Sequence, residues 1–78
     1  MQIIIYTQTV CPKCKALTKG LREKGLVFKE KNVDREKGAL LDLLMNQISG
    51  TPAVRINDVW LYNPTIERVL EEVNRKAV

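Results

Sequence analysis

The sequence predicts an α/β domain with a four-stranded mixed sheet and helices on both faces. Apolar periodicity orders the elements as β-α-β-α-β-β-α along the chain. The first β-α-β unit should join two parallel strands through a right-handed crossover. A two-residue turn between the last two strands should add an antiparallel pair. With 78 residues, 45% of them hydrophobic, the chain is expected to form one domain spanning residues 1–78.

The first half of the chain supplies two predicted strands and two predicted helices. Residues 2–6 form an isoleucine-led run that is typical of a buried central strand. Residues 12–24 have helical spacing, and Gly25 stands where a left-handed helix stop is expected. Residues 26–33 predict a strand and residues 36–48 a second helix. The apolar residues that this helix offers for burial are Leu40, Leu41, Leu44, Met45 and Ile48.

A hairpin follows in the second half of the chain. Its expected strands are Ala53–Ile56 and Val59–Tyr62, joined by Asn57-Asp58, two residues that tolerate positive φ. This register places Arg55 opposite Trp60. Packing with a cation–π contribution is therefore favoured over ligand recognition as the role of the tryptophan.

A last helix closes the chain. Asn63 is expected to cap it and Pro64 to occupy its first position, since both residue types favour those places. The apolar stripe of this helix consists of Ile66, Val69, Leu70 and Val73.

The net charge of +4 is concentrated around one predicted helix, which carries Lys13, Lys15, Lys19, Arg22 and Lys24. These residues form either a solvated helix face or a positive field that lowers a thiolate pKa and attracts an acidic partner. Four aromatic residues without basic–aromatic interleaving argue against nucleic-acid binding. The apolar runs are too short for a membrane span, and no signal-peptide pattern is visible. We expect a cytoplasmic monomer.

Cys11 and Cys14, the only cysteines, stand at the predicted strand-to-helix junction. If the helix starts near Pro12, the Cys11 sulfur faces unpaired N–H groups and the positive end of the helix dipole. That position and Lys13 should lower the pKa of Cys11 below the free-thiol value of about 8.5. Cys11 is thus the predicted attacking thiolate and Cys14 the predicted resolving thiol. The absence of histidine excludes Cys–His catalysis.

Two other interpretations of this pair stay open. The cysteines could be an inert core pair, or they could be half of a metal site. A mononuclear zinc site needs four ligands, so we expect no metal within one chain. An iron–sulfur cluster or a soft metal would have to be shared between two subunits.

Thr51-Pro52 is a second feature of interest, at the start of a predicted strand. In this context we expect a cis peptide bond, which would turn the Thr51 backbone toward the cysteines. Its N–H and C=O groups could then pair with an extended substrate segment.

Four segments together resemble the glutaredoxin-like branch of the thioredoxin superfamily: Ile5-Tyr6-Thr7, Cys11-Pro12-Lys13-Cys14, Val33-Asp34 and Gly50-Thr51-Pro52-Ala53-Val54. The resemblance implies a minimal thioredoxin fold and a small thiol–disulfide oxidoreductase, an electron carrier that reduces protein disulfides. It implies no bound cofactor beyond the redox-active Cys11–Cys14 disulfide. The site residues that it implies are Cys11 and Cys14 in catalysis, Pro12 and Lys13 in activation, and Tyr6, Thr51 and Pro52 in substrate binding.

Residues around the cysteine motif bear on the electron donor. Glutathione-dependent glutaredoxins usually carry a lysine where this chain has Gln8, often an aromatic residue where it has Lys13, and glycines where it has Val59–Pro64. Trp60 and Pro64 are more similar to NrdH-type redoxins, which thioredoxin reductase reduces and which supply ribonucleotide reductase. The expected donor is therefore a reductase, with glutathione as the alternative.

Overall fold

The computed structural model describes residues 1–77. Its strands are β1 (Ile3–Thr7), β2 (Lys29–Asn32), β3 (Ala53–Ile56) and β4 (Val59–Tyr62), and its helices are α1 (Pro12–Glu23), α2 (Lys37–Met45) and α3 (Ile66–Ala77). The four strands form one sheet in the order β2-β1-β3-β4. The β1–β2 pair is parallel and the other two pairs are antiparallel, which confirms the predicted mixed sheet.

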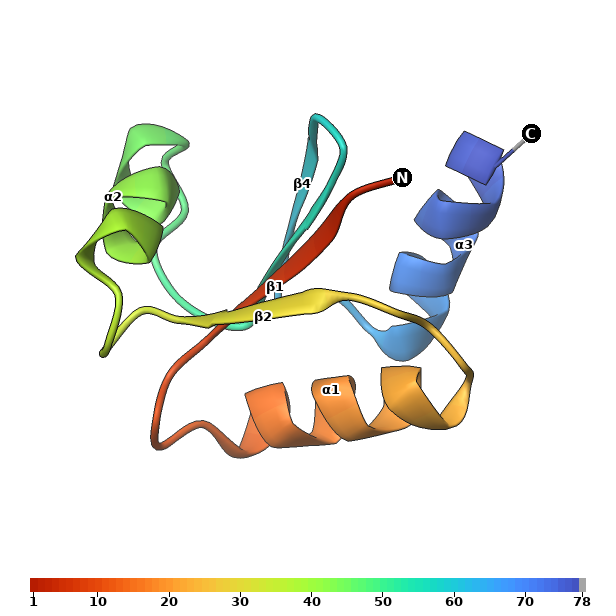
Figure 1. The fold of residues 1–78 in the computed structure, drawn as a ribbon, viewed down its shortest axis with the longest axis horizontal. Coiled ribbons are helices and arrows are strands. Elements are labelled where there is room, and N and C mark those ends of the chain that lie inside the picture. The colour runs from red at the N-terminus through yellow and green to blue at the C-terminus, as the bar shows by residue number, and fades with distance from the viewer. Residues whose placement is uncertain (78) are drawn as a thin grey trace.

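The sheet is covered on both faces because successive side chains of β1 point to opposite sides. Ile3 and Ile5 pack with residues of α1 and α3, whereas Ile4 and Tyr6 pack with residues of α2. Figure 1 shows α1 and α2 on opposite sides of the sheet and α3 beside α1. Among residues 1–77, no helix has the length and apolar character that a membrane span requires.

The hairpin has the predicted register. Arg55 pairs with Trp60, and Asn57 adopts a φ of 54° in the turn. The indole packs against Tyr6 with 5.2 Å between ring centroids, and the Arg55 guanidinium lies 5.8 Å from the indole centroid. These contacts support the packing role of Trp60. The predicted stop after α1 is also confirmed, since Gly25 has a φ of 80°.

The strand predicted over residues 26–33 is shorter than expected. The Leu26 N–H donates to the carbonyl of Leu21 at 3.1 Å, so this residue closes the end of α1. Leu26 and Phe28 then pack against the core from a non-strand segment, and β2 begins only at Lys29.

The predicted cap of the last helix is wrong by two residues. Asn63 has a φ of 48°, and its N–H donates to the carbonyl of Pro52 at 2.8 Å. The cap is Thr65, whose Oγ1 accepts from the N–H of Arg68 at 3.1 Å. Pro64 therefore precedes α3, and the Asn63 hydrogen bond ties the start of this helix to the Pro52 region.

The helix α2 buries a different side from the one expected. It packs on the sheet through Ala39 and Leu43, one turn apart. Its four remaining large apolar side chains are 44–81% exposed: Leu40, Leu41, Leu44 and Met45. Because α2 is apolar on both sides, periodicity did not determine which side faces the sheet.

Candidate functional site

The candidate site forms where β1 ends and α1 begins. Cys11 is the N-cap residue of α1, and Pro12 is the first helical residue, as predicted. The Cys11 Sγ accepts a hydrogen bond from the backbone N–H of Cys14 at 3.2 Å. The sulfur thus occupies the place that a serine or aspartate oxygen takes in an ordinary helix cap. A negative charge at this atom would face the positive end of the helix dipole.

Cys11 and Cys14 form a disulfide, with 5.2 Å between their Cα atoms. The two residues differ in exposure: Cys11 is 8% exposed and Cys14 only 2%. A partner molecule therefore reaches Cys11 more easily than Cys14. The Cys14 carbonyl also accepts from the Thr18 hydroxyl at 3.0 Å, one turn further along the helix.

Thr51 and Pro52 lie against this pair. The peptide bond between them is cis, as predicted. The Thr51 Oγ1 lies 3.7 Å from the Cys11 Sγ and 2.7 Å from the Gln8 Oε1. Pro52 is buried, and its carbonyl accepts from the Asn63 N–H. The structure thus brings together four predicted site residues, namely Cys11, Cys14, Thr51 and Pro52, and adds Gln8 to them.

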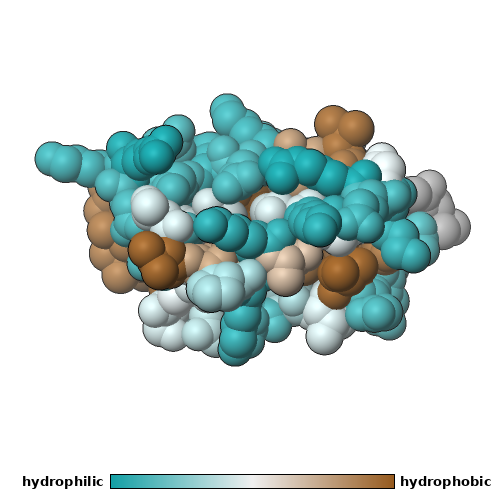
Figure 2. All heavy atoms as spheres, turned by 90° about the horizontal axis from the view of Figure 1, so that it is seen from below, coloured by the Kyte–Doolittle hydropathy of each residue, from teal (hydrophilic) through white to brown (hydrophobic). Residues whose placement is uncertain are grey.

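Basic side chains are exposed on the helix that begins at the pair. Lys13, Lys15 and Lys19 are exposed on α1. None of the ion pairs among residues 1–77 includes any of these three lysines. Figure 2, which views the molecule from below and so from the side of α1, shows a largely hydrophilic surface. This charge is available to attract an anionic group or to stabilise a thiolate.

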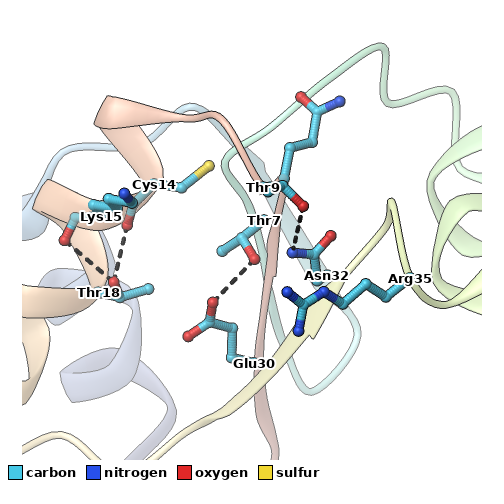
Figure 3. Close-up of a pocket in the computed structure, with 9 residues that line it drawn as sticks. Thr7, Thr9, Cys14, Lys15, Thr18, Glu30, Asn32 and Arg35 are labelled. Carbon is cyan, nitrogen blue, oxygen red and sulfur yellow. Dashed lines mark hydrogen bonds between the residues drawn. The ribbon is translucent and has the colours of Figure 1, made fainter.

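A polar cavity of about 220 Å³ lies on the Cys14 side of the pair. The Thr7 hydroxyl donates to the Glu30 carboxylate at 3.0 Å, and the Asn32 amide donates to the Thr9 hydroxyl at 3.3 Å. Figure 3 shows these side chains facing Cys14 across the cavity. The lining residues are Thr7, Gln8, Thr9, Cys14, Lys15, Thr18, Glu30, Asn32 and Arg35.

A second, more apolar groove of about 320 Å³ lies between α1 and the start of α3. Ala16, Leu17 and Ile66 contribute apolar surface, and Pro52 and Lys13 border it on the side of the cysteines. An extended chain segment bound beside Cys11 could therefore place a side chain here.

Tyr6 is the one predicted site residue that lies apart from the cysteines. It is fully buried on the α2 face of the sheet, and its hydroxyl donates to the Asp42 carboxylate at 3.1 Å. With no exposed surface, Tyr6 cannot contact a substrate in this conformation. The structure gives it a packing role in place of the expected substrate-binding one.

The residues that could hold a metal are few. In the part of the chain that the structure describes, no three side chains of His, Cys, Asp or Glu gather closely enough to bind an ion.

This arrangement is that of a thiol–disulfide protein, with its cysteine pair at the start of a helix. The glutaredoxin family model matches residues 3–61, more than half of the chain. The chain belongs to the glutaredoxin family, whose members are thiol–disulfide oxidoreductases. No curated protein sequence matches significantly.

Solved structures share the fold. The thioredoxin-like protein BC3987 is 27% identical, with 90% of this chain and 97% of that chain covered and a TM-score of 0.83. The NrdH-redoxin of Escherichia coli is 29% identical, covers 88% of this chain and 95% of that chain, and has a TM-score of 0.77. A glutaredoxin from Archaeoglobus fulgidus, 22% identical, covers 92% and 85% with a TM-score of 0.71. The predicted thioredoxin-like fold is thus confirmed.

Sequence reasoning did not foresee the polar cavity behind Cys14. The signal was present in the parallel pairing of two strands. Thr7, which ends β1, pairs with Asn32, and its hydroxyl donates to Glu30, two residues before Asn32 on β2. A run of Lys-Glu-Lys-Asn next to a buried isoleucine strand could have indicated this cluster.

Proposed function

We propose that the protein reduces disulfide bonds of other proteins through its Cys11–Cys14 pair. The observation that supports this most directly is the asymmetry of the pair. Cys11 is the more exposed residue and has its sulfur at the N-terminus of α1, whereas Cys14 is buried one turn further on. A nucleophile needs access and a stabilised thiolate, and a resolving thiol needs only proximity.

The proposed reaction has two exchange steps. The Cys11 thiolate attacks one sulfur of the substrate disulfide, forms a mixed disulfide and releases the other substrate sulfur as a thiolate. The Cys14 thiolate then attacks the Cys11 sulfur, which releases the second substrate thiolate and forms the Cys11–Cys14 disulfide. Two electrons pass from the protein dithiol to the substrate. A cytoplasmic location, where reductants regenerate the dithiol, suits this cycle.

The role of each cysteine is tested with insulin as the disulfide substrate. Cys11→Ser should abolish turnover, because the hydroxyl that replaces the thiol is not ionised at neutral pH. Cys14→Ser should still attack and should accumulate a mixed disulfide at Cys11, which mass spectrometry detects. A Cys11→Ser variant as active as the parent would refute the proposal.

For the electron donor we propose a protein, such as a thioredoxin reductase, rather than glutathione. Two backbone positions at the start of α3 offer no donor for a glutathione carboxylate. The Asn63 N–H is already bonded to the Pro52 carbonyl, and Pro64 has no N–H. The likeness to the Escherichia coli NrdH-redoxin points the same way.

Two coupled assays separate the donors. One regenerates the dithiol with thioredoxin reductase and NADPH, and the other with glutathione, glutathione reductase and NADPH. We expect faster turnover in the first assay. Turnover with glutathione alone would assign the chain to the glutathione-dependent glutaredoxins, with Lys13 as the candidate carboxylate-binding residue of the groove.

A further inference from the structure

The Thr51 hydroxyl lies between two acceptors, and it cannot donate its proton to both at the same time. Its Oγ1 is 2.7 Å from the Gln8 Oε1 and 3.7 Å from the Cys11 Sγ. An amide carbonyl oxygen only accepts, and a threonine hydroxyl has one proton to donate. At 2.7 Å from a carbonyl oxygen, that proton must point toward Gln8 in the disulfide form of the protein.

Reduction changes the balance between the two acceptors. A disulfide sulfur is a weak acceptor, whereas a thiolate carries a full negative charge and forms a charge-assisted hydrogen bond. An external dithiol that becomes a disulfide supplies two electrons and two protons. The electrons and one proton convert the pair to a Cys11 thiolate and a Cys14 thiol, and the second proton goes to solvent. Rotation about the Cβ–Oγ1 bond of Thr51 is then sufficient to redirect its proton to Cys11.

Gln8 can release the proton at small cost. Its side chain is exposed, so water can replace the Thr51 hydroxyl as the partner of its carbonyl oxygen. Among the hydrogen bonds of residues 1–77, none joins Gln8 to either cysteine, so the hydrogen-bonded route from Gln8 to Cys11 runs through Thr51.

We propose that Gln8 is a positioning residue of the redox centre: its side-chain carbonyl holds the Thr51 hydroxyl proton in the disulfide form and competes with the Cys11 thiolate for it in the reduced form. Thr51, which contacts the sulfur, donates to the thiolate directly. This inference rests on the proposed role of Cys11 as the attacking thiolate.

The charged groups near the pair do not change in the variants that test this. Lys13 borders the apolar groove, and Lys15, Glu30 and Arg35 line the cavity beside Cys14. Gln8→Leu and Thr51→Val remove the amide and the hydroxyl respectively while they keep approximate volume and charge. Thr51→Ser keeps the hydroxyl and is the matched control.

The experiment is the pH dependence of Cys11 alkylation by iodoacetamide in the reduced full-length protein, with the modified residue identified by peptide mass. Thr51→Val should raise the midpoint by about one pH unit, a tenfold change in the ionisation constant, because the thiolate loses a charge-assisted bond. Thr51→Ser should restore it. Gln8→Leu should lower the midpoint by about half a pH unit, because the competing acceptor is gone.

The double variant Gln8→Leu/Thr51→Val distinguishes an effect through Thr51 from a direct one. If Gln8 acts only through the hydroxyl, its removal should not change the midpoint when Thr51 is valine. An equal shift in both backgrounds, no shift, or a rise in Gln8→Leu would each overturn the inference. The alkylation midpoints do not depend on turnover. The inference about Gln8 can therefore fail while Cys11→Ser still abolishes activity, and the proposed function can fail while the midpoints shift as expected.

Discussion

The two faces of the sheet are built differently, and the redox pair belongs to the more extensively packed one. On the α1–α3 face the buried cluster is aliphatic and comprises Ile3, Ile5, Leu17, Leu21, Val54, Ile56, Leu61 and Val69. The α2 face has a smaller cluster, in which one tyrosine makes a hydrogen bond to a half-buried carboxylate: Ile4, Tyr6, Val33, Ala39, Leu43 and Ala53. The helix that carries the cysteines is therefore fixed by apolar packing from two directions.

Gly20 lies at the contact between α1 and α3. A Cβ at this position would meet the Cδ1 end of the Ile66 side chain, which would have to move. The α2 face has no comparable helix–helix contact among residues 1–77 and leaves four large apolar side chains exposed. Apolar packing therefore holds α1 against both the sheet and α3, whereas α2 packs on the sheet through one side only.

The largest expected difference between the two faces is in the stability lost when a buried leucine is replaced by alanine. Leu21→Ala should lower the free energy of unfolding by about 3–5 kcal/mol, since the cavity lies between two helices and the sheet. Leu43→Ala should cost only about 2 kcal/mol, because α2 is free to move toward the sheet. Urea denaturation measures both values. Leu44→Ala, at a site 61% exposed, is the control and should change stability by less than about 0.5 kcal/mol. An equal or larger loss for Leu43→Ala would contradict the comparison.

The sequence was sufficient for α1 because several independent signals agreed on its position. Leu17 and Leu21 recur at helical spacing, Pro12 marks the helix start, and Gly25 marks its end, and all four positions agree with the structure. On the other face the apolar periodicity did not indicate which side of α2 faces the sheet, since α2 is apolar on both sides. Burial of Ala39 was not predicted, because it is small and the same helix carries four larger apolar residues.

The candidate site was predictable to the extent that it depended on chain order. Cys11, Cys14 and Pro52 lie where the strand-to-helix placement and the resemblance indicated. What single residues do there depends on contacts between distant segments. The Thr51 hydroxyl reaches Gln8 across 43 residues of sequence, and no local pattern reports that distance. The substrate-binding role expected for Tyr6 does not fit the structure, because strand alternation places its buried side chain on the α2 face, away from the cysteines.

A smaller effect is expected from the helix cap of the α1–α3 face. Thr65→Ala should lower the free energy of unfolding by about 1 kcal/mol, because the Arg68 N–H loses its acceptor. Thr65→Ser should retain most of the stability, because its hydroxyl can still accept from the Arg68 N–H. Urea denaturation of both variants tests the cap. An unchanged stability in Thr65→Ala would contradict the assignment of Thr65 as the cap.

The smallest expected effect at neutral pH comes from the polar contact of the α2 face, and it has a distinctive pH dependence. Burial away from water, followed by the hydrogen bond to Asp42 and the charge of Asp42, raises the pKa of Tyr6 from 10.0 to about 12. The native state therefore retains a proton that the unfolded chain releases near pH 10. The resulting stabilisation is complete below pH 10 and is lost as the pH rises toward about 12.

Tyr6→Phe isolates this contribution from that of the lysines, which lose their charge over the same range. At pH 7 the variant should be less stable than the parent by no more than about 1 kcal/mol, since water can solvate the half-buried Asp42. Between about pH 10 and pH 12 the parent should lose stability faster than the variant, so the difference shrinks. Tyr62→Phe, at a side chain 56% exposed, is the matched control. A constant difference between parent and Tyr6→Phe across this range would show that the α2 face, like the other, is held by apolar packing alone.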